Sequence, residues 1–310
     1  MIVSSGRRRL PAAESHAPLM ELSSVIVHYR SREALRQCLA SLESETTGLA
    51  REVVVVDNDR DHHALDLLAR EFPKVRGILN QENVGYARAV NQGIAATTGE
   101  FVLVMNPDCL PQPGSVAALV GYLRAHPRAG VAGPMILDRD GSLQYSARSF
   151  PDHLTFLFNR YSLLTRLFPG NRFTRRYLLS DWDHTTMREV DWLSGACLLV
   201  RRTAIDQVGP MDEAYFMFNE DVDWCRRMKL AGWAVAYVPD ARVVHDIGAS
   251  KKRVSTRVIV QRHLGMIHYF HKFHPIHPVT ALLADGLILM RAGLMLMANA
   301  MRPVSRGPSA

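Results

Sequence analysis

Two patterns of hydrophobic and polar positions alternate along the first half of the chain. Apolar runs rich in β-branched residues occur at 23–29 and 51–58, and a further run ends in "VLVMNPDC" at 103–110. Such runs are typical of strands buried on both faces of a parallel sheet. Between them, apolar residues recur every three or four positions, which predicts amphipathic helices, with Ser31 as the N-cap of the first. The alternation predicts an α/β fold with a mainly parallel central sheet flanked by helices.

The second half of the chain is less regular. A helix at 113–127 and a strand at 129–137 precede a stretch, about 140–188, in which aromatic residues and arginines gather. That stretch fits a substrate loop, a lid or a packing insertion. Strand character returns over 190–205, and a loop, a helix and a strand follow before residue 250.

The C-terminal stretch "VTALLADGLILMRAGLMLMANAM" (279–301) is nearly long enough to span a bilayer. Asp285 and Arg291 interrupt it, and each central charge costs about 2.5–3.5 kcal/mol on insertion scales. Asp285 also lies nearly opposite an apolar stripe at helical spacing. The stripe consists of Leu283, Leu287, Met290, Leu294 and Met297. We therefore expect a C-terminal amphipathic helical tail, packed or interfacial rather than transmembrane.

Composition and charge narrow the classes of partner. The 310 residues carry a formal net charge of +7, which suits a nucleotide, a nucleic acid or an anionic membrane. Nucleic-acid binding rests on this charge alone, so we expect none. The run "KKR" at 251–253 fits peripheral contact with anionic lipid, although a solvated basic face explains it equally well. Residues 1–20 are basic and lack an apolar segment of signal-peptide type, which predicts a disordered tail.

The four cysteines are scattered and form no CxxC pair, so neither a disulfide framework nor a zinc site is predicted. Cys38 falls among leucines at helical spacing and is expected to pack in the core. This usage of cysteine fits a reduced, cytoplasmic compartment.

Polar residues follow the ends of the predicted strands. The three groups are His28 with Tyr29, Asp57 with Asn58, and Asn106 with Asp108. Taken alone, Asn106-Pro107-Asp108 fits either a turn or a metal ligand held rigidly by proline. The carboxyl ends of parallel strands share one edge of a sheet, where ligands bind, so three groups at this edge favour a site.

Five segments occur in a specific order: "VDN", "ENVGYARAVNQGI", "MNPD", "WLSGACLLVRR" and "FNEDVDWCRRMKLAGW". Over residues 23 to about 250 the chain thereby resembles family 2 of the inverting glycosyltransferases, which have the GT-A fold, and in particular bacterial rhamnosyltransferase-like members. The resemblance implies a glycosyltransferase domain at 21–250, with a donor half at about 21–135 and an acceptor half at about 136–250. A helical segment at 251–310 would follow, with possible membrane association.

The resemblance also implies an activity. A sugar, with rhamnose as the candidate, would move from a nucleoside-diphosphate sugar to a hydroxyl of a glycan or polyprenyl-diphosphate-linked acceptor, with inversion, in cell-surface polysaccharide synthesis. The enzyme would be cytoplasmic, at the inner face of the cell membrane. The alternatives are a sugar nucleotidyltransferase and a non-catalytic sugar-nucleotide or lipid-surface binding protein. A nucleotidyltransferase usually has a glycine-rich loop after its first strand, and "VIVHYRSRE" has no glycine.

By the same resemblance, donor-nucleotide binding falls to His28, Tyr29, Asp57, Asn83, Gly85, Arg88 and Asn106. Asp57 matches the acid that accepts a hydrogen bond from the base. Gly85 would allow close backbone approach at a helix start, which favours anions; a simple turn glycine is the alternative. Asp108 matches the metal position of the Asp-x-Asp element, whose first position is Asn106 here, so one full charge would face Mg²⁺ or Mn²⁺. His245 is a candidate second ligand or a structural histidine.

Glu220 and Asp221 match the acidic pair that supplies the catalytic base. With Asn219 as N-cap, both acids fall in the first helical turn, where the helix dipole favours their ionised forms. We expect Asp221 to be the base, because the family most often uses the second acid, with Glu220 as the alternative. The segment with Trp192, Ser194 and Gly195 matches the acceptor side. Trp192 would stack on a sugar ring or belong to the core.

Overall fold

The computed structural model describes residues 20–61, 63–153, 155, 165, 167–246 and 255–301. The predicted disordered tail and the basic run at 251–253 therefore lie outside the described residues, except for Met20.

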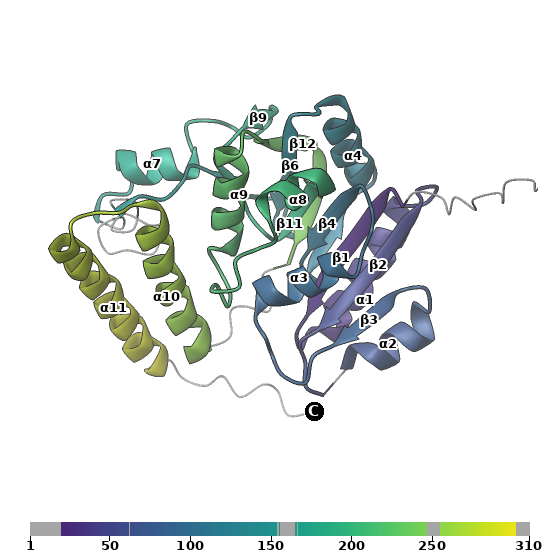
Figure 1. Cartoon of the computed structure of the whole chain (residues 1–310), viewed down its shortest axis with the longest axis horizontal. Coiled ribbons are helices and arrows are strands. Elements are labelled where there is room, and N and C mark those ends of the chain that lie inside the picture. The colour runs from purple at the N-terminus through teal and green to yellow at the C-terminus, as the bar shows by residue number, and fades with distance from the viewer. Residues whose placement is uncertain are drawn as a thin grey trace, which may run out of the picture.

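A ten-stranded mixed sheet forms the centre of the molecule (Figure 1). Its first part is parallel, in the order β3 (Arg76–Leu79), β2 (Arg51–Asp57), β1 (Leu22–His28) and β4 (Phe101–Met105). These are the strands predicted from the apolar runs, and every residue of β1 and β4 is buried. The prediction of an α/β fold with a mostly parallel central sheet is confirmed.

The second part of the sheet interleaves the two halves of the chain. Next to β4 come β11 (Cys197–Arg201), β6 (Ala129–Leu137), β12 (Ala234–His245) and β5 (Cys109–Pro111). Strand β11 is antiparallel to both of its neighbours, whereas β12 runs parallel to β6. Short strands β7 (Leu143–Gln144) and β9 (Arg188–Glu189) pair with β6 and β12, and β8 (Ala147–Arg148) pairs with β10 (Trp192–Leu193) in a separate small sheet.

The prediction of strand structure over 190–205 is wrong for its last residues. Residues Arg202–Val208 form helix α8, because Ala204 and Ile205 bury themselves on one side of a helical turn. The other helices are α1 (Arg32–Glu45), α2 (His63–Glu71), α3 (Tyr86–Ala95), α4 (Ser115–Ala125), α7 (Arg172–Leu178), α9 (Glu220–Leu230), α10 (Thr256–Phe273) and α11 (Pro278–Ala300).

Two hydrophobic clusters lie on opposite faces of the sheet. Alternation along β1 sends Val25 to the cluster that includes α3 and α9, and Ile26 to the cluster with α1, α2 and α4. Cys38 is buried in the second cluster, as predicted, and all four cysteines are free and buried. Burying one such aliphatic side chain contributes roughly 1.5–3 kcal/mol, so both faces hold the strand ends in place.

Helices α10 and α11 form a hairpin beside α9, away from the sheet (Figure 1). A network of ion pairs joins the hairpin to α9. Lys272 Nζ of α10 lies 2.6 Å from Asp223 Oδ2 and 2.7 Å from Asp212 Oδ2. Asp223 is fully buried and also accepts a hydrogen bond from Arg227 Nε at 2.6 Å. The α9 helix is therefore fastened both to the core and to the C-terminal hairpin.

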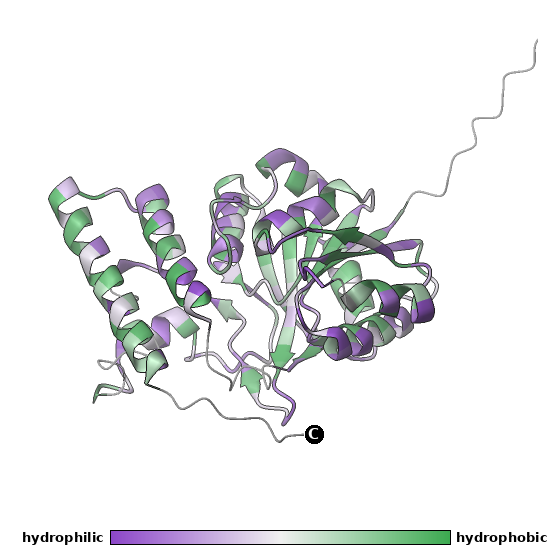
Figure 2. Ribbon diagram, turned by 90° about the horizontal axis from the view of Figure 1, so that it is seen from below, coloured by the Kyte–Doolittle hydropathy of each residue, from purple (hydrophilic) through white to green (hydrophobic). Residues whose placement is uncertain are grey.

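Helix α11 is rich in apolar residues (Figure 2), and those of the predicted stripe are exposed. Leu283, Met290 and Leu294 are 65%, 58% and 56% exposed. Asp285 instead faces α10, where its Oδ2 lies 2.8 Å from His271 Nε2. By length and composition alone, Pro278–Ala300 is the one helix of the described chain that qualifies as a candidate membrane span, and little of it is buried.

Candidate active site

The register of β1 on β2 places His28 directly beside Asp57. His28 Nδ1 lies 2.9 Å from Asp57 Oδ1, and His28 Nε2 accepts a hydrogen bond from the Ser31 amide at 3.1 Å. An acceptor on one side and a donor on the other define a neutral ring with its proton on Nδ1. Both ring nitrogens are used, so His28 orients Asp57, and any influence on a donor nucleotide passes through that acid.

The Asp57 carboxylate is buried at the end of β2. Burial raises the pKa of Asp57, but the hydrogen bonds from His28 and the Asp59 amide outweigh burial and leave the pKa below its ordinary value. Oδ2 is buried and accepts no hydrogen bond from the described residues. Next to the strand end, the Tyr29 ring is 45% exposed, with the Arg30 guanidinium 5.2 Å from its centroid. An ionised acceptor beside an exposed aromatic ring suits a planar base that carries an N–H group.

The loop before α3 is tied to the end of β2 and to a distant loop. Asn58 Nδ2 donates to Gly85 O at 3.1 Å and to Asn83 Oδ1 at 3.4 Å. Gly85 has φ +95°, and a Cβ there would lie 2.7 Å from Phe216 O. The position therefore excludes side chains for two reasons, positive φ and the close approach of residue 216.

The start of α3 is partly used by the protein itself. The Tyr86 amide donates to Phe216 O at 2.6 Å, so the first amide of this helix is not free for an anion. The Arg88 side chain is exposed, and its Nε lies 3.8 Å from Glu213 Oε2. The predicted contacts of Asn83, Gly85 and Arg88 with ribose and diphosphate stay predictions.

Asp108 and His245 come together because β5 and β12 pair antiparallel, which sets His245 opposite Cys109. Asp108 Oδ1 lies 3.3 Å from His245 Nε2. His245 Nδ1 lies 3.0 Å from Gln144 Oε1, while Gln144 Nε2 donates to Asp138 and to the His245 carbonyl. That pattern fixes the amide orientation of Gln144 and puts the His245 proton on Nδ1.

In the neutral form of this ring, the Nε2 lone pair faces Asp108 Oδ1, 3.3 Å away. Asp108 Oδ1 accepts no hydrogen bond from the part of the chain that the structure describes. A carboxylate and a neutral imidazole whose other nitrogen is held by an amide form a donor set that suits a divalent cation. The Cys109 thiol lies close to the possible ligand atoms of Asp108 and His245. However, its Sγ donates to Ala196 O at 3.2 Å, and burial raises the pKa of this thiol well above its ordinary value. We assign Cys109 to the core.

Asn106 acts through its backbone in this structure. Its amide donates to Ala196 O at 2.8 Å, and its carbonyl accepts from the Cys109 amide at 3.2 Å. These bonds fasten the end of β4 to the segment that precedes β11. Its predicted role in donor binding stays a prediction.

Glu220 and Asp221 open α9 and have different surroundings. Asp221 is partly exposed, and its two oxygens accept hydrogen bonds from the Gly195 and Val222 amides at 2.8 and 2.9 Å. Burial raises the pKa of Asp221, and these two N–H groups oppose that rise. Glu220 is buried, its Oε2 accepts no hydrogen bond from the described residues, and burial together with the neighbouring Asp221 charge raises its pKa well above the ordinary value. Of the two, Asp221 is better held as an anion, and each of its oxygens keeps a second lone pair.

The backbone that leads into α9 adopts an uncommon conformation. Phe218 and Asn219 have φ values of +69° and +71°. Such conformations cost about 1–3 kcal/mol each for residues other than glycine and gather at functional sites. Asn219 occupies the predicted N-cap position without a side-chain capping bond; its Nδ2 donates instead to the Arg262 carbonyl of α10 at 3.4 Å.

The segment with Trp192, Ser194 and Gly195 runs beside the acid pair. A Cβ on Gly195 would lie 3.2 Å from Asp221 Cβ, so the absence of a side chain lets the two segments meet. Trp192 is 5% exposed, its Nε1 donates to Ser149 O, and the Arg148 guanidinium covers one ring face at 5.0 Å. This burial matches the core alternative for Trp192, so we give its ring no stacking role; the acceptor role of Ser194 and Gly195 stays a prediction.

Two residues beside the acids escaped the sequence reasoning. Tyr86 is buried, and its hydroxyl donates to the Gly195 carbonyl at 2.9 Å, which fixes the peptide that binds Asp221. Its place inside "ENVGYARAVNQGI" was a usable signal. Arg148 lies in the irregular stretch 140–188, where no pattern singled it out.

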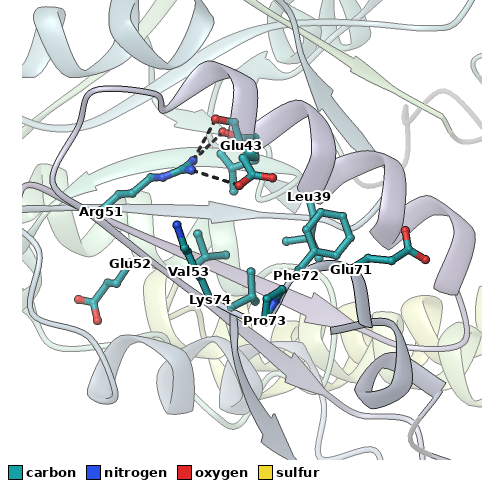
Figure 3. Close-up of a pocket in the computed structure, with 11 residues that line it drawn as sticks. Leu39, Glu43, Arg51, Glu52, Val53, Glu71, Phe72, Pro73 and Lys74 are labelled. Carbon is teal, nitrogen blue, oxygen red and sulfur yellow. Dashed lines mark hydrogen bonds and ion pairs between the residues drawn. The ribbon is translucent and has the colours of Figure 1, made fainter. Parts of the chain in front are cut away.

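A pocket of about 310 Å³ opens at the opposite edge of the sheet (Figure 3). Arg51, the first residue of β2, lines it and donates to the Leu42 and Glu43 carbonyls. The predicted site lies at the other end of β2, after Asp57. Because ligands in such sheets bind at the carboxyl ends of strands, this pocket is separate from the candidate site.

Two solved structures share the fold. GalNAc-T7 with UDP, GalNAc and Mn²⁺ matches with a TM-score of 0.56 and 18% identity over 74% of this chain and 44% of that chain. The mannosyltransferase PcManGT from Pyrobaculum calidifontis, in complex with GDP-Man and Mn²⁺, matches with a TM-score of 0.54 and 19% identity over 91% of this chain and 76% of that chain. The fold is that of a GT-A glycosyltransferase.

The comparison of sequences gives the family. The sequence model of the family described as Glycosyl transferase family 2 matches residues 23–183. N-acetylglucosaminyl-diphospho-decaprenol L-rhamnosyltransferase of Mycobacterium tuberculosis is 38% identical over 253 residues, covering 78% of this chain and 81% of the relative. Rhamnosyltransferase WbbL of Escherichia coli K12 is 24% identical over 229 residues, covering 71% and 81%. The chain belongs to Glycosyl transferase family 2, and it is a glycosyltransferase.

Proposed function

We propose that this enzyme transfers rhamnose, with inversion, from a nucleoside-diphosphate rhamnose to a hydroxyl of a sugar carried on a polyprenyl diphosphate, in the synthesis of a cell-surface polysaccharide. The observation that carries the proposal is the clamp on Asp221. Its carboxylate is held by the Gly195 amide inside the segment predicted to face the acceptor. The printed names of the relatives support the sugar and the lipid-linked acceptor.

The donor nucleotide would bind at the ends of β1, β2 and β4. Asp57 Oδ2 would accept a hydrogen bond from the base, and Tyr29 would flank it. Asp108 and His245 would hold the divalent cation, Mg²⁺ or Mn²⁺. When bound, the cation supplies positive charge that stabilises the departing nucleoside diphosphate. The Mn²⁺ in both structural neighbours supports this assignment.

The chemical step would depend on Asp221. With two amides fixing its oxygens, Asp221 would accept the proton of the acceptor hydroxyl through a remaining lone pair while that oxygen attacks the anomeric carbon. The bond between the anomeric carbon and the donor phosphate oxygen breaks on the opposite face. Glu220, kept neutral by burial, would leave Asp221 as the only anion of the pair.

The acceptor lipid would bring the enzyme to a membrane. The outward apolar face of α11 would lie on the lipid surface, with Asp285 turned inward to His271. Four free, buried cysteines fit the reduced cytoplasm. We therefore place the enzyme at the inner face of the cell membrane, in peripheral contact.

A direct assay tests the proposal. The enzyme is incubated with Mn²⁺, dTDP-rhamnose (the donor class in the name of one relative) and N-acetylglucosaminyl diphosphate on a short prenyl chain. We expect release of nucleoside diphosphate, a product heavier by one deoxyhexose, and an inverted linkage in its NMR spectrum. Release of inorganic diphosphate would indicate nucleotidyl transfer instead, and binding without turnover under every metal condition would indicate a binding protein.

A further inference from the structure

Arg148 occupies a fixed place on the acceptor side of the site. It lies on β8, directly opposite Trp192 of β10 in the small sheet. Its Nε donates to the Tyr145 carbonyl at 2.7 Å, and its guanidinium carbon lies 5.0 Å from the Trp192 ring centroid and 5.7 Å from that of Tyr177. One hydrogen bond and two aromatic rings hold the guanidinium.

The two terminal nitrogens of this guanidinium lack partners. Throughout the described chain, neither makes a hydrogen bond or a close ion pair, although the side chain is partly buried. In other partly buried arginines, at least one terminal nitrogen donates a hydrogen bond to a carbonyl or a side chain. These are Arg201, Arg202, Arg226 and Arg227. A guanidinium whose fork is free and whose orientation is set by stacking is well arranged to bind a phosphate with two parallel hydrogen bonds.

The position relative to the base identifies the phosphate. Trp192 begins the segment whose Gly195 amide binds Asp221, and the positive charge of Arg148 partly offsets the effect of burial on the pKa of Asp221. The β8–β10 pairing also sets Arg148 opposite Trp192, three residues before the Gly195 that contacts Asp221, so Arg148 lies on the same side of the base as that segment. An acceptor sugar that presents a hydroxyl to Asp221 carries its diphosphate on the anomeric carbon, one ring width away.

We propose that Arg148 binds the diphosphate that joins the acceptor sugar to its lipid, and so selects diphosphate-linked acceptors over uncharged glycosides. This inference rests on the proposed function. It gives the enzyme two separate diphosphate sites: the donor diphosphate at Asp108 and His245, and the acceptor diphosphate at the Arg148 fork.

The test measures binding and turnover with two probes. One is N-acetylglucosaminyl diphosphate on a short prenyl chain; the other is the same sugar as an uncharged alkyl glycoside. Arg148→Gln and Arg148→Lys are compared with Arg188→Gln, which removes an exposed arginine that also stacks on a tryptophan, at 5.4 Å from Trp182. Calorimetry with nucleoside diphosphate present gives the acceptor Kd without needing transfer, and thermal melting checks the fold.

We expect Arg148→Gln to weaken binding of the diphosphate probe by about 10- to 100-fold, the worth of a charge-assisted hydrogen bond. Arg148→Lys should lose less, because it keeps the charge but not the fork. The uncharged probe and Arg188→Gln should stay at wild-type values. Under turnover, the loss should lie in the KM for the diphosphate acceptor.

Three outcomes would overturn the inference. An equal loss of kcat with both probes, with a shifted acid limb in the pH profile, would show that Arg148 acts on Asp221 instead. Unchanged binding of the diphosphate probe in Arg148→Gln, or no binding by the wild type, would remove the site. If the wild type binds the probe through Arg148 but transfers no sugar to it, the anion site stands and the proposed transfer fails.

Discussion

The proposed donor edge and the proposed acceptor side of this site are built by different means. At the donor edge, Asp57 and Asp108 sit at strand ends, and the sheet register alone brings each beside its histidine. On the acceptor side, Asp221 and Gly195 come from loops and a helix start, and single hydrogen bonds join them. The donor edge is therefore preorganised by the core, whereas the acceptor side depends on local contacts that one substitution can release.

Removing the metal position should have the largest effect. Asp108→Ala, or excess chelator, should bring transfer to background and abolish Mn²⁺ binding measured by calorimetry, while thermal melting in the absence of metal changes little. Asp246→Asn is the matched control, since this neighbouring acid pairs with Arg139 at 2.9 Å. Full activity of Asp108→Ala would show that the proposed donor edge holds no metal ion needed for transfer.

Asp221→Asn should lower kcat by about 10²- to 10⁴-fold, the usual contribution of a general base. Asn keeps an oxygen for the Gly195 amide but cannot take the proton. Donor affinity should stay near wild type, because in the proposed mechanism this residue contacts the acceptor and not the nucleotide. Glu220→Gln is the control and should cost less; the reverse order would move the base to Glu220.

The pH dependence of kcat sharpens the same assignment. A base works only when ionised, so activity should fall as pH drops through the pKa of Asp221. Because burial raises that pKa, the acid limb should lie above the ordinary value of about 3.9 for aspartate. A rate that stays flat down to pH 4 would exclude Asp221 as the base.

Asp57→Asn should weaken nucleoside-diphosphate binding by roughly 1.5–3 kcal/mol, as for a charge-assisted hydrogen bond. This variant can retain the acceptor for His28 and the Asp59 amide, and it replaces Oδ2 by an amide group that donates. Calorimetry measures the affinity, and Asp61→Asn, an exposed acid nearby, is the control. An unchanged Kd would show that the base is read elsewhere.

The smallest effect on turnover should come from α11. Replacing Leu283, Leu287 and Met290 by Gln should reduce flotation with anionic liposomes, while kcat on a water-soluble acceptor stays unchanged. Leu230→Gln, at an apolar residue 73% exposed at the end of α9, is the control. Equal flotation of the triple variant and the wild type would assign the stripe to a subunit interface.

The contrast between the two sides also explains what the sequence could predict. Apolar runs rich in β-branched residues predicted the parallel strands. Because the carboxyl ends of parallel strands meet at one edge of the sheet, His28, Asp57 and Asp108 could be assigned to that edge from the sequence. Strand β5 could not: it has three residues, and its pairing with β12 is what brings Asp108 to His245. The order of the motifs predicted that Glu220 and Asp221 lie at a helix start. It did not predict that the Gly195 amide binds Asp221 and thereby distinguishes it from Glu220.

Long-range contacts set the limits elsewhere. Nothing local in the sequence marks Phe216 as the group that fills the space beside Gly85, or Arg148 as the cover of Trp192. The helix α8 was misread as strand because "CLLVRRTAI" is apolar throughout its first half, and an apolar run does not show where a strand stops. The apolar stripe of α11, by contrast, has a clear helical period and was predicted, although the sequence left open whether it packs on the protein or faces outward.

The bond between Lys272 and Asp223 bears on how this enzyme can be shortened or recombined. A protein that ends before Lys272 would leave the buried Asp223 with Arg227 as its remaining cation. Losing one partner of a fully buried pair costs roughly 3–5 kcal/mol, and the loss here should be smaller because the Lys272 side chain is 30% exposed. Such a protein should hold α9, which carries the proposed base, less firmly. A water-soluble version should therefore keep α10 and alter α11. Replacing the hairpin by that of a relative should succeed only when residues 212 and 223 are replaced together with it, because they pair with Lys272.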